Sequence, residues 1–230
     1  MIANPWHEHA DTYAEWIAAR EAGGLAHDTV LGALLDVLGD VAGLEVLDAG
    51  CGEGYLARVL AARGARITGI DVSERLIAMA GSKGDSVAYR VADLCRSLPE
   101  LAGRFDAIAS YLVLNDVPDI RGFARTMWHL ARPGAKAVFA FNNPYSAVVR
   151  TQITDYFANG AIGVYRGMSE ELGQPVRFYH RTLEEYLEAF LSAGFRLTAL
   201  RDVMHDHQRE WLLPAEVRFP YMMVLSFLKP

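Results

Sequence analysis

Apolar runs of strand length alternate with amphipathic stretches along most of this 230-residue chain. The runs predict five strands, at Leu44–Ala49, Ala65–Ile70, Ser86–Val91, Phe105–Ser110 and Lys136–Phe141. Strands that alternate with helices are typical of a parallel sheet covered by helices on both faces. The pattern therefore predicts a doubly wound α/β fold.

Two later segments have the apolar spacing of amphipathic helices. The first, Pro118–Ala131, gathers five apolar residues on one stripe, namely Ile120, Phe123, Met127, Leu130 and Ala131. The second opens with the capping box Thr182-Leu-Glu-Glu185 and ends at Gly194. We expect its inward residues to be Leu183, Tyr186, Leu187, Phe190 and Leu191. Two final strands, Phe195–Val203 and Arg218–Leu228, bring the sheet to seven.

A glycine-rich turn follows the first strand, in the stretch Val46-Leu-Asp-Ala-Gly50-Cys-Gly52-Glu-Gly54-Tyr-Leu. Glycine allows backbone angles closed to other residues and lets a ligand approach the main chain. The start of the following helix favours an anionic or strongly polar group there. Asp71 comes about 20 residues later, where an acid can accept both hydroxyls of a ribose. The sequence therefore predicts a nucleotide-like cofactor.

The chain resembles the class I S-adenosylmethionine-dependent methyltransferases, specifically their small-molecule branch. The segments that carry the likeness are Val46–Leu56, Ile67–Ser73, Arg90–Leu94, Phe105–Asp119 and the turn Leu130-Ala-Arg-Pro-Gly134. Several motifs in the right order are more specific than any one of them. The likeness, which covers roughly residues 44–142, implies a Rossmann-like, mostly parallel sheet with an antiparallel last strand. It also implies S-adenosyl-L-methionine as cofactor and S-adenosyl-L-homocysteine as product.

The resemblance assigns cofactor contacts residue by residue. Asp48 would organise the turn and the methionine amino group, and Asp71 would hold the ribose. Val72 would pack on the adenine, and Asp93 would accept from the adenine amino group. The full predicted set is Tyr13, Asp48, Gly50, Cys51, Gly52, Asp71, Val72, Ala92, Asp93, Leu94, Ser110 and Tyr111. As alternatives, Asp71 and Asp93 cap helices or turns, and Tyr13 is an aromatic core residue.

Two segments lie outside the resembling core. Residues 1–40 contain the predicted helices Pro5–Ala22 and His27–Leu38, and residues 145–181 form a long insert that is too aromatic for simple disorder. We interpret both as a helical cap over the acceptor pocket, within a single methyltransferase domain spanning residues 1–230. The alternative is plain packing of amphipathic helices on the core.

Three residues are candidates for handling the acceptor. His180, in Phe178-Tyr-His-Arg-Thr182, has the titration range of a general base, although a lone histidine is more often structural. Asn115 and Asp116 follow the fourth strand and can orient a hydroxyl or an amine, while Asp116 can instead cap the next helix. Asn143-Pro144-Tyr145 is similar to a loop of amine methyltransferases, but it follows the fifth strand and lacks that loop's second proline.

Composition and charge favour one cellular compartment and argue against some kinds of binding partner. The net charge is −6 and the basic residues are scattered, so nucleic acid is an unlikely partner. The cysteines, Cys51 and Cys95, have no metal-type spacing, which favours a reduced, cytoplasmic protein. Cys51 fits a crowded turn better than it fits a nucleophile, because no base is placed beside it. We predict no signal segment, no membrane span and no metal site; the scattered histidines are His7, His9, His205 and His207.

These features predict direct in-line methyl transfer to an O or N nucleophile of a small organic molecule. The alternatives are C-methylation, a nicotinamide-dependent oxidoreductase and a non-catalytic cofactor-binding protein. Tyr55 stands where the dinucleotide fingerprint has its third glycine, and Asp93 adds a second acid, so the oxidoreductase is disfavoured. The sequence leaves the acceptor and the oligomeric state open.

Overall fold

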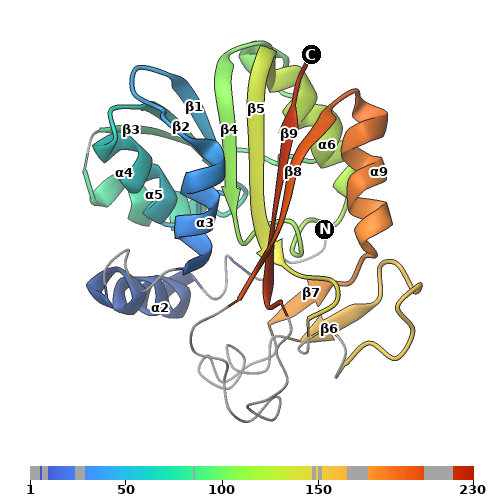
Figure 1. The fold of residues 1–230 in the computed structure, drawn as a ribbon. Coiled ribbons are helices and arrows are strands. Elements are labelled where there is room, and N and C mark those ends of the chain that lie inside the picture. The colour runs from blue at the N-terminus through green and yellow to red at the C-terminus, as the bar shows by residue number, and fades with distance from the viewer. Residues whose placement is uncertain are drawn as a thin grey trace.

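A computed structural model describes residues 6, 10–23, 29–84, 86–146, 149, 152–164, 176–204 and 220–230. Seven strands form one sheet, and two more form a small second sheet (Figure 1). The strands of the large sheet are β1 Glu45–Ala49, β2 Arg66–Asp71, β3 Val87–Val91, β4 Phe105–Tyr111, β5 Ala131–Asn142, β8 Arg196–Val203 and β9 Met222–Leu228.

The order of strands in the large sheet is β3-β2-β1-β4-β5-β9-β8. Strands β1 to β5 pair in parallel, whereas β9 is antiparallel to both of its neighbours, β5 and β8. The predicted seven-stranded, mostly parallel sheet with an antiparallel last strand is confirmed. Because β1 to β4 run the same way, the loops that follow them meet at one edge of the sheet.

Helices cover both faces of this sheet. The helices are α2 Ala10–Gly23, α3 Thr29–Leu38, α4 Tyr55–Ala62, α5 Glu74–Ser82, α6 Ile120–Leu130 and α9 Leu183–Ala193, with a 3₁₀ turn η2 at Pro99–Leu101. One hydrophobic cluster joins α6 and α9 to the sheet, and another joins α3 and α4 to its opposite face. Adjacent strand residues divide between the clusters, with Val46, Ala107 and Val138 in one and Leu47, Ile108 and Phe139 in the other.

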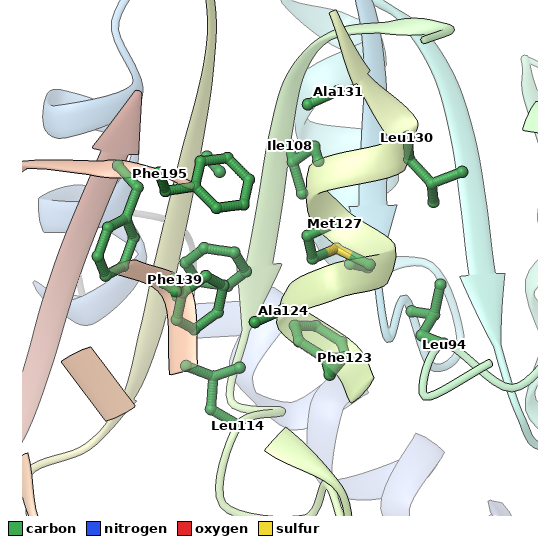
Figure 2. Close-up of a cluster of buried hydrophobic side chains, with 14 of the residues drawn as sticks. Leu94, Ile108, Leu114, Phe123, Ala124, Met127, Leu130, Ala131, Phe139 and Phe195 are labelled. Carbon is green, nitrogen blue, oxygen red and sulfur yellow. The ribbon is translucent and has the colours of Figure 1, made fainter. Parts of the chain in front are cut away.

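The stripe predicted on the first amphipathic helix is confirmed. Phe123, Ala124, Met127 and Leu130 of α6 are buried and face the sheet near Ile108 and Phe139 (Figure 2). Phe123 and Phe139 meet edge to face, with ring centroids 6.1 Å apart. Asp119 caps the helix by accepting from the Gly122 N–H at 2.8 Å.

The second predicted helix differs from expectation in two details. The Thr182 hydroxyl accepts from the Glu185 N–H at 3.1 Å, but the Thr182 N–H donates to Asn159 and the Glu185 carboxylate pairs with Arg121. Only half of the predicted capping box therefore forms. Leu191 was predicted to face inward but is 46% exposed, because it lies about 100° around the helix from the buried Phe190.

Of the two outer segments, α2 and the small second sheet of the insert lie beyond one end of the large sheet, whereas α3 packs on its face (Figure 1). The first predicted helix is observed as α2; the start assigned to it and that of the second helix fall outside the described residues. An Asp11–Arg75 ion pair joins α2 to α5. In the insert, β6 Ile162–Val164 pairs antiparallel with β7 Arg177–Tyr179, a strand pair that the sequence did not predict.

Gly194 generates a prediction about stability. It ends α9 with φ +112°, and a Cβ there would lie 2.9 Å from the Trp128 ring. We expect Gly194→Ala to lower the free energy of unfolding by ~1–3 kcal/mol. Gly81→Ala, at an open helical position in α5, is the matched control and should be stabilising. Urea denaturation measures both, and equal effects would contradict the assignment.

Candidate active site

The turn between β1 and α4 is held in a left-handed backbone by its glycines. Gly50, Gly52 and Gly54 have φ of 79°, 53° and 89°. A Cβ on Gly50 would lie 2.5 Å from Val113, in the loop after β4. The N–H groups of Gly50 and Cys51 both donate to the Ile70 carbonyl, at 2.8 and 3.1 Å. The turn is therefore fixed against β2 and leaves no room for a side chain at residue 50.

Asp71, the last residue of β2, is bonded to the same turn. Its carboxylate accepts from the Gly52 N–H and the Ser73 N–H, each at 2.9 Å. Burial raises its pKa, and these amides oppose the shift. Asp71 does not cap the helix α5, because the hydroxyl of Ser73 does. Its bond from the Ser73 N–H, two residues on, is the turn role that the alternative also allowed. Each carboxylate oxygen keeps a further lone pair for a ligand hydroxyl.

Asp48 is a buried carboxyl without a hydrogen-bond donor among the described residues. It is 1% exposed, and neither oxygen has a partner. Burial, reinforced by the charge of Asp71, raises its pKa to about 8; the Ala57 amide opposes this in part without forming a hydrogen bond of normal geometry. Asp48 is therefore mostly protonated at neutral pH.

Two other turn residues are buried beside Asp48. Glu53 forms ion pairs with Arg58, at 3.1 Å, and with Lys83. Sequence reasoning gave Glu53 no role, and the only local signal was the arginine five residues later. Burial and the nearby acids raise the pKa of the Cys51 thiol well above its usual value. The thiol therefore stays protonated, as a small packing residue would.

A pocket opens between this turn and α2. It measures about 280 Å³ including its mouth. Its walls are Tyr13, Ile17, Asp48, Gly50, Cys51, Glu53, Tyr55, Leu56 and Tyr111. Tyr13 crosses over the turn, since a Cβ on Gly52 would lie 3.4 Å from its ring. The structure thus brings together five predicted cofactor residues, Tyr13, Asp48, Gly50, Cys51 and Tyr111, next to Gly52 and Asp71.

The residues predicted for the adenine follow the ends of β2 and β3. Val72 is 50% exposed, as a surface for a ring requires. Ala92 donates its N–H to the Asp71 carbonyl at 2.9 Å, and Leu94 is buried. The Asp93 carboxylate accepts from the Cys95 N–H and pairs with Arg96. These adenine contacts remain predictions.

Ser110 lies deeper than the pocket wall. Its hydroxyl is buried and donates to the Ala49 carbonyl at 2.7 Å, which joins β4 to β1. The predicted contact between Ser110 and the methionine portion remains a prediction. Leu112, two residues later, has φ +63°, which is rare for a residue other than glycine. This backbone turns the chain from β4 into the loop that carries Asn115 and Asp116.

Asn115 forms hydrogen bonds to three neighbouring parts of the chain. Its amide nitrogen donates to the Tyr186 hydroxyl at 3.2 Å, and its amide oxygen accepts from the Asn142 N–H at 2.9 Å. Its carbonyl accepts from the Tyr179 N–H. Asp116 is half-buried on the same loop. It does not cap α6, because Asp119 does.

Arg181 is a buried cation that sequence reasoning missed. Its guanidinium donates to the carbonyls of Leu114, Val117 and Pro118, at 3.4, 2.6 and 3.1 Å. It also lies 5.4 Å from the centre of the Tyr179 ring. Arg181 therefore holds the loop after β4 in place from the segment that leads into α9. An arginine between His180 and Thr182 gave no signal of this contact in the sequence.

His180 belongs to the insert and does not line the pocket. It is 1% exposed, and its Nε2 is bonded to the Tyr156 carbonyl at 2.8 Å. Its backbone bonds with Ala161 and Gly160. This placement favours the structural alternative, and its role as a base stays a prediction. Asn143 is likewise buried, donating to Asp202 and accepting from the Tyr145 N–H.

Two features are absent from the residues that the structure describes. None of their helices has both the length and the apolar character to cross a membrane. They contain no group of three or more His, Cys, Asp or Glu arranged to hold a metal ion. His7, His9, His205 and His207 lie outside the described part of the chain.

Known proteins share this fold and these motifs. A family described as a methyltransferase domain matches residues 47–139. The ubiquinone biosynthesis O-methyltransferase of Coxiella burnetii is 30% identical over 186 residues, covering 78% of this chain and 76% of that protein. The Pseudomonas syringae pv. tomato protein of the same name is 34% identical over 134 residues, 54% of this chain but only 56% of that protein.

A solved S-adenosylmethionine-dependent methyltransferase from Mesorhizobium loti is 28% identical, with a TM-score of 0.70. The superposition covers 90% of this chain and 99% of that one. The chain belongs to the class I S-adenosylmethionine-dependent methyltransferases. It is therefore an enzyme of a family whose cofactor is S-adenosylmethionine.

The residues present fit this cofactor. The glycine turn lines the pocket with Gly50 and Cys51, where a ligand can approach the main chain. The buried carboxyl of Asp48 lacks a donor within the described residues, and an ammonium group supplies one. Asp71 has lone pairs left for the ribose hydroxyls.

Asp48 yields a second prediction about stability. In the unfolded chain it ionises near its usual pKa, whereas the folded protein keeps it neutral up to about pH 8. Its contribution therefore lowers the free energy of unfolding as the pH rises from about 4 to about 8. Asp48→Asn should stabilise the cofactor-free protein by on the order of 3 kcal/mol more at pH 8 than at pH 5. Denaturant titrations at both pH values measure this, and an equal difference at the two would contradict it.

Arg181 yields a third prediction about stability. Arg181→Met leaves three loop carbonyls without their donor, so we expect it to lower the free energy of unfolding by ~2–4 kcal/mol. Arg132→Met, which removes an exposed ion pair with Asp106, should cost less than ~1 kcal/mol. Thermal and urea denaturation of both variants provide the comparison. A similar loss in the two would show that the carbonyl contacts of Arg181 contribute little.

Proposed function

We propose that the protein transfers the methyl group of S-adenosylmethionine to an O or N nucleophile of a small organic acceptor, by direct in-line displacement. The observation that carries this is the alignment with the Coxiella O-methyltransferase. That alignment runs over 186 residues, twice the 93 residues of the matched domain at 47–139. The likeness therefore extends beyond the cofactor-binding motifs, and the relative's name favours oxygen as the nucleophile.

The protein's own contribution to this reaction is chiefly orientation. The bound cofactor supplies a methyl group already activated by its sulfonium. Holding an acceptor in line with that methyl is worth up to ~7–11 kcal/mol. We assign the acceptor side to the loop after β4, the insert and the N-terminal helix. The insert presents aromatic surface, with Tyr145 stacked on Tyr156 at 5.1 Å and Phe157 exposed.

A hydroxyl acceptor must also lose a proton. The base must be a group that can accept a proton close to the pocket. The amide of Asn115 cannot act as a base, and His180 does not line the pocket. Asp116 carries a carboxylate and lies half-buried on the loop that follows Tyr111, which lines the pocket. We therefore assign the base role to Asp116. Asn115 positions the loop that carries it, and His180 holds the insert.

Transfer of isotopically labelled methyl from S-adenosylmethionine into a pooled small-molecule extract tests the proposal. We expect label in small organic products, a loss of ~10²–10⁴-fold in Asp116→Asn and a loss below tenfold in His180→Gln. Cofactor affinity should stay within about threefold in both, whereas Asp71→Ala should weaken it roughly tenfold or more.

The pattern of losses separates the alternatives. No labelled product from a protein that binds the cofactor would favour the non-catalytic alternative. Full activity in Asp116→Asn would favour an amine acceptor that needs no base. A large loss in His180→Gln alone would return the base role to His180.

A further inference from the structure

The carboxyl of Asp48 is buried on the wall of the pocket. Neither of its oxygens accepts a hydrogen bond from any described residue. A buried carboxyl without a donor is costly as an anion and much less so as a neutral acid. A cationic donor on a ligand would stabilise the ionised form.

The charges around Asp48 do not supply that cation. Asp71 on β2 adds negative charge, and Glu53 in the turn adds more. Arg58 of α4 and Lys83 after α5 are both directed to Glu53. The Cys51 thiol is kept protonated by burial and by the same acids. Ionised Asp48 would face the negative charges of Asp71 and Glu53, which the attraction of Arg58 offsets only in part.

The remaining titratable neighbours are tyrosines. Tyr13 of α2, Tyr55 of α4 and Tyr111 of β4 line the same pocket. On β3, burial raises the pKa of Tyr89 to about 12, with a smaller contribution from the acids. A tyrosine side chain carries no positive charge in any protonation state, so none of these residues can stabilise ionised Asp48 as a cation would.

The cofactor carries one group that matches this carboxyl in both the methylated and the demethylated form. S-adenosylmethionine and S-adenosylhomocysteine share the α-ammonium group, whereas only the first has a sulfonium. An ammonium against a buried carboxylate favours the ionised form of the acid. A ligand that has the ribose and adenine but no amino acid portion cannot favour the ionised form of Asp48 in this way.

We propose that Asp48 carries a proton in the cofactor-free protein and releases it to solvent when the α-ammonium group of the cofactor binds beside it. The neutral acid and the ammonium become a carboxylate–ammonium pair, and one proton passes to the buffer. Cofactor binding is then coupled to proton release, and affinity falls as the pH falls. The inference rests on the cofactor alone and is independent of the acceptor proposed above.

Calorimetry of S-adenosylhomocysteine binding at pH 6.5, in buffers of different ionisation enthalpy, tests this directly. An α-amino group ionises near pH 8, so the ligand stays fully charged at this pH. We expect the wild-type protein to release about 0.5–1 proton per ligand bound. Its affinity should rise by up to about tenfold between pH 6 and pH 7.

Two matched comparisons assign the proton. 5′-Methylthioadenosine, which lacks the ammonium, should bind the wild-type protein without proton release and with little pH dependence. Asp48→Asn should still bind 5′-methylthioadenosine, and its residual binding of S-adenosylhomocysteine should release no proton. Asp36→Asn, an exposed acid on α3, should release as much as the wild type.

Three results would overturn the proposal. One is a binding enthalpy for S-adenosylhomocysteine that does not depend on the buffer. Another is undiminished proton release in Asp48→Asn. The third is equal release with 5′-methylthioadenosine, which would move the proton to Asp71 at the ribose. If Asp48→Asn binds S-adenosylhomocysteine too weakly to measure, the two ligands on the wild-type protein still decide the question.

Discussion

The close approach of the glycine turn to the ends of β2 and β4 is the constraint on which the active site depends. Two amides of the turn share the Ile70 carbonyl, and a third binds Asp71. On the other side, Val113 leaves no space for a Cβ on Gly50. The turn lies close against the sheet edge. The pocket forms between this turn, Tyr13 and Tyr111. The pocket is thus built by backbone geometry first and by side chains second.

The loop after β4 is the second fixed element, and it ties the core to the insert. Arg181 binds three of its carbonyls, and Asn115 joins it to Tyr186 and to β5. Further along, the Leu183 N–H donates to the Tyr156 hydroxyl. These contacts link the loop after β4 to the insert and to α9 through polar groups. A displacement of the insert would therefore act on the loop that carries Asp116.

The strands of the large sheet, the apolar stripe of α6 and the glycine turn could be predicted from the sequence, because each is encoded by neighbouring residues. It could not give the contacts of Glu53 or Arg181, whose partners are set by the packing of separate elements. The β6–β7 pair was missed because short strands without clear alternation resemble loop. Leu191 was misplaced because a stripe read at i and i+4 does not fix the exact rotation of a helix. His180 has the chemistry of a base, but only the fold shows that Tyr156 engages it.

A carboxyl that costs folding free energy and awaits a charged ligand has a consequence for engineering this protein. Selection for heat resistance without cofactor would favour replacement of Asp48, since the fold gains by losing it. The best survivors of such a screen would then be poor cofactor binders with intact cores. Screens run with S-adenosylhomocysteine present reverse this bias, because the bound ligand then stabilises the folded protein that keeps Asp48. The choice of additive in the screen thus decides which residue is kept at position 48.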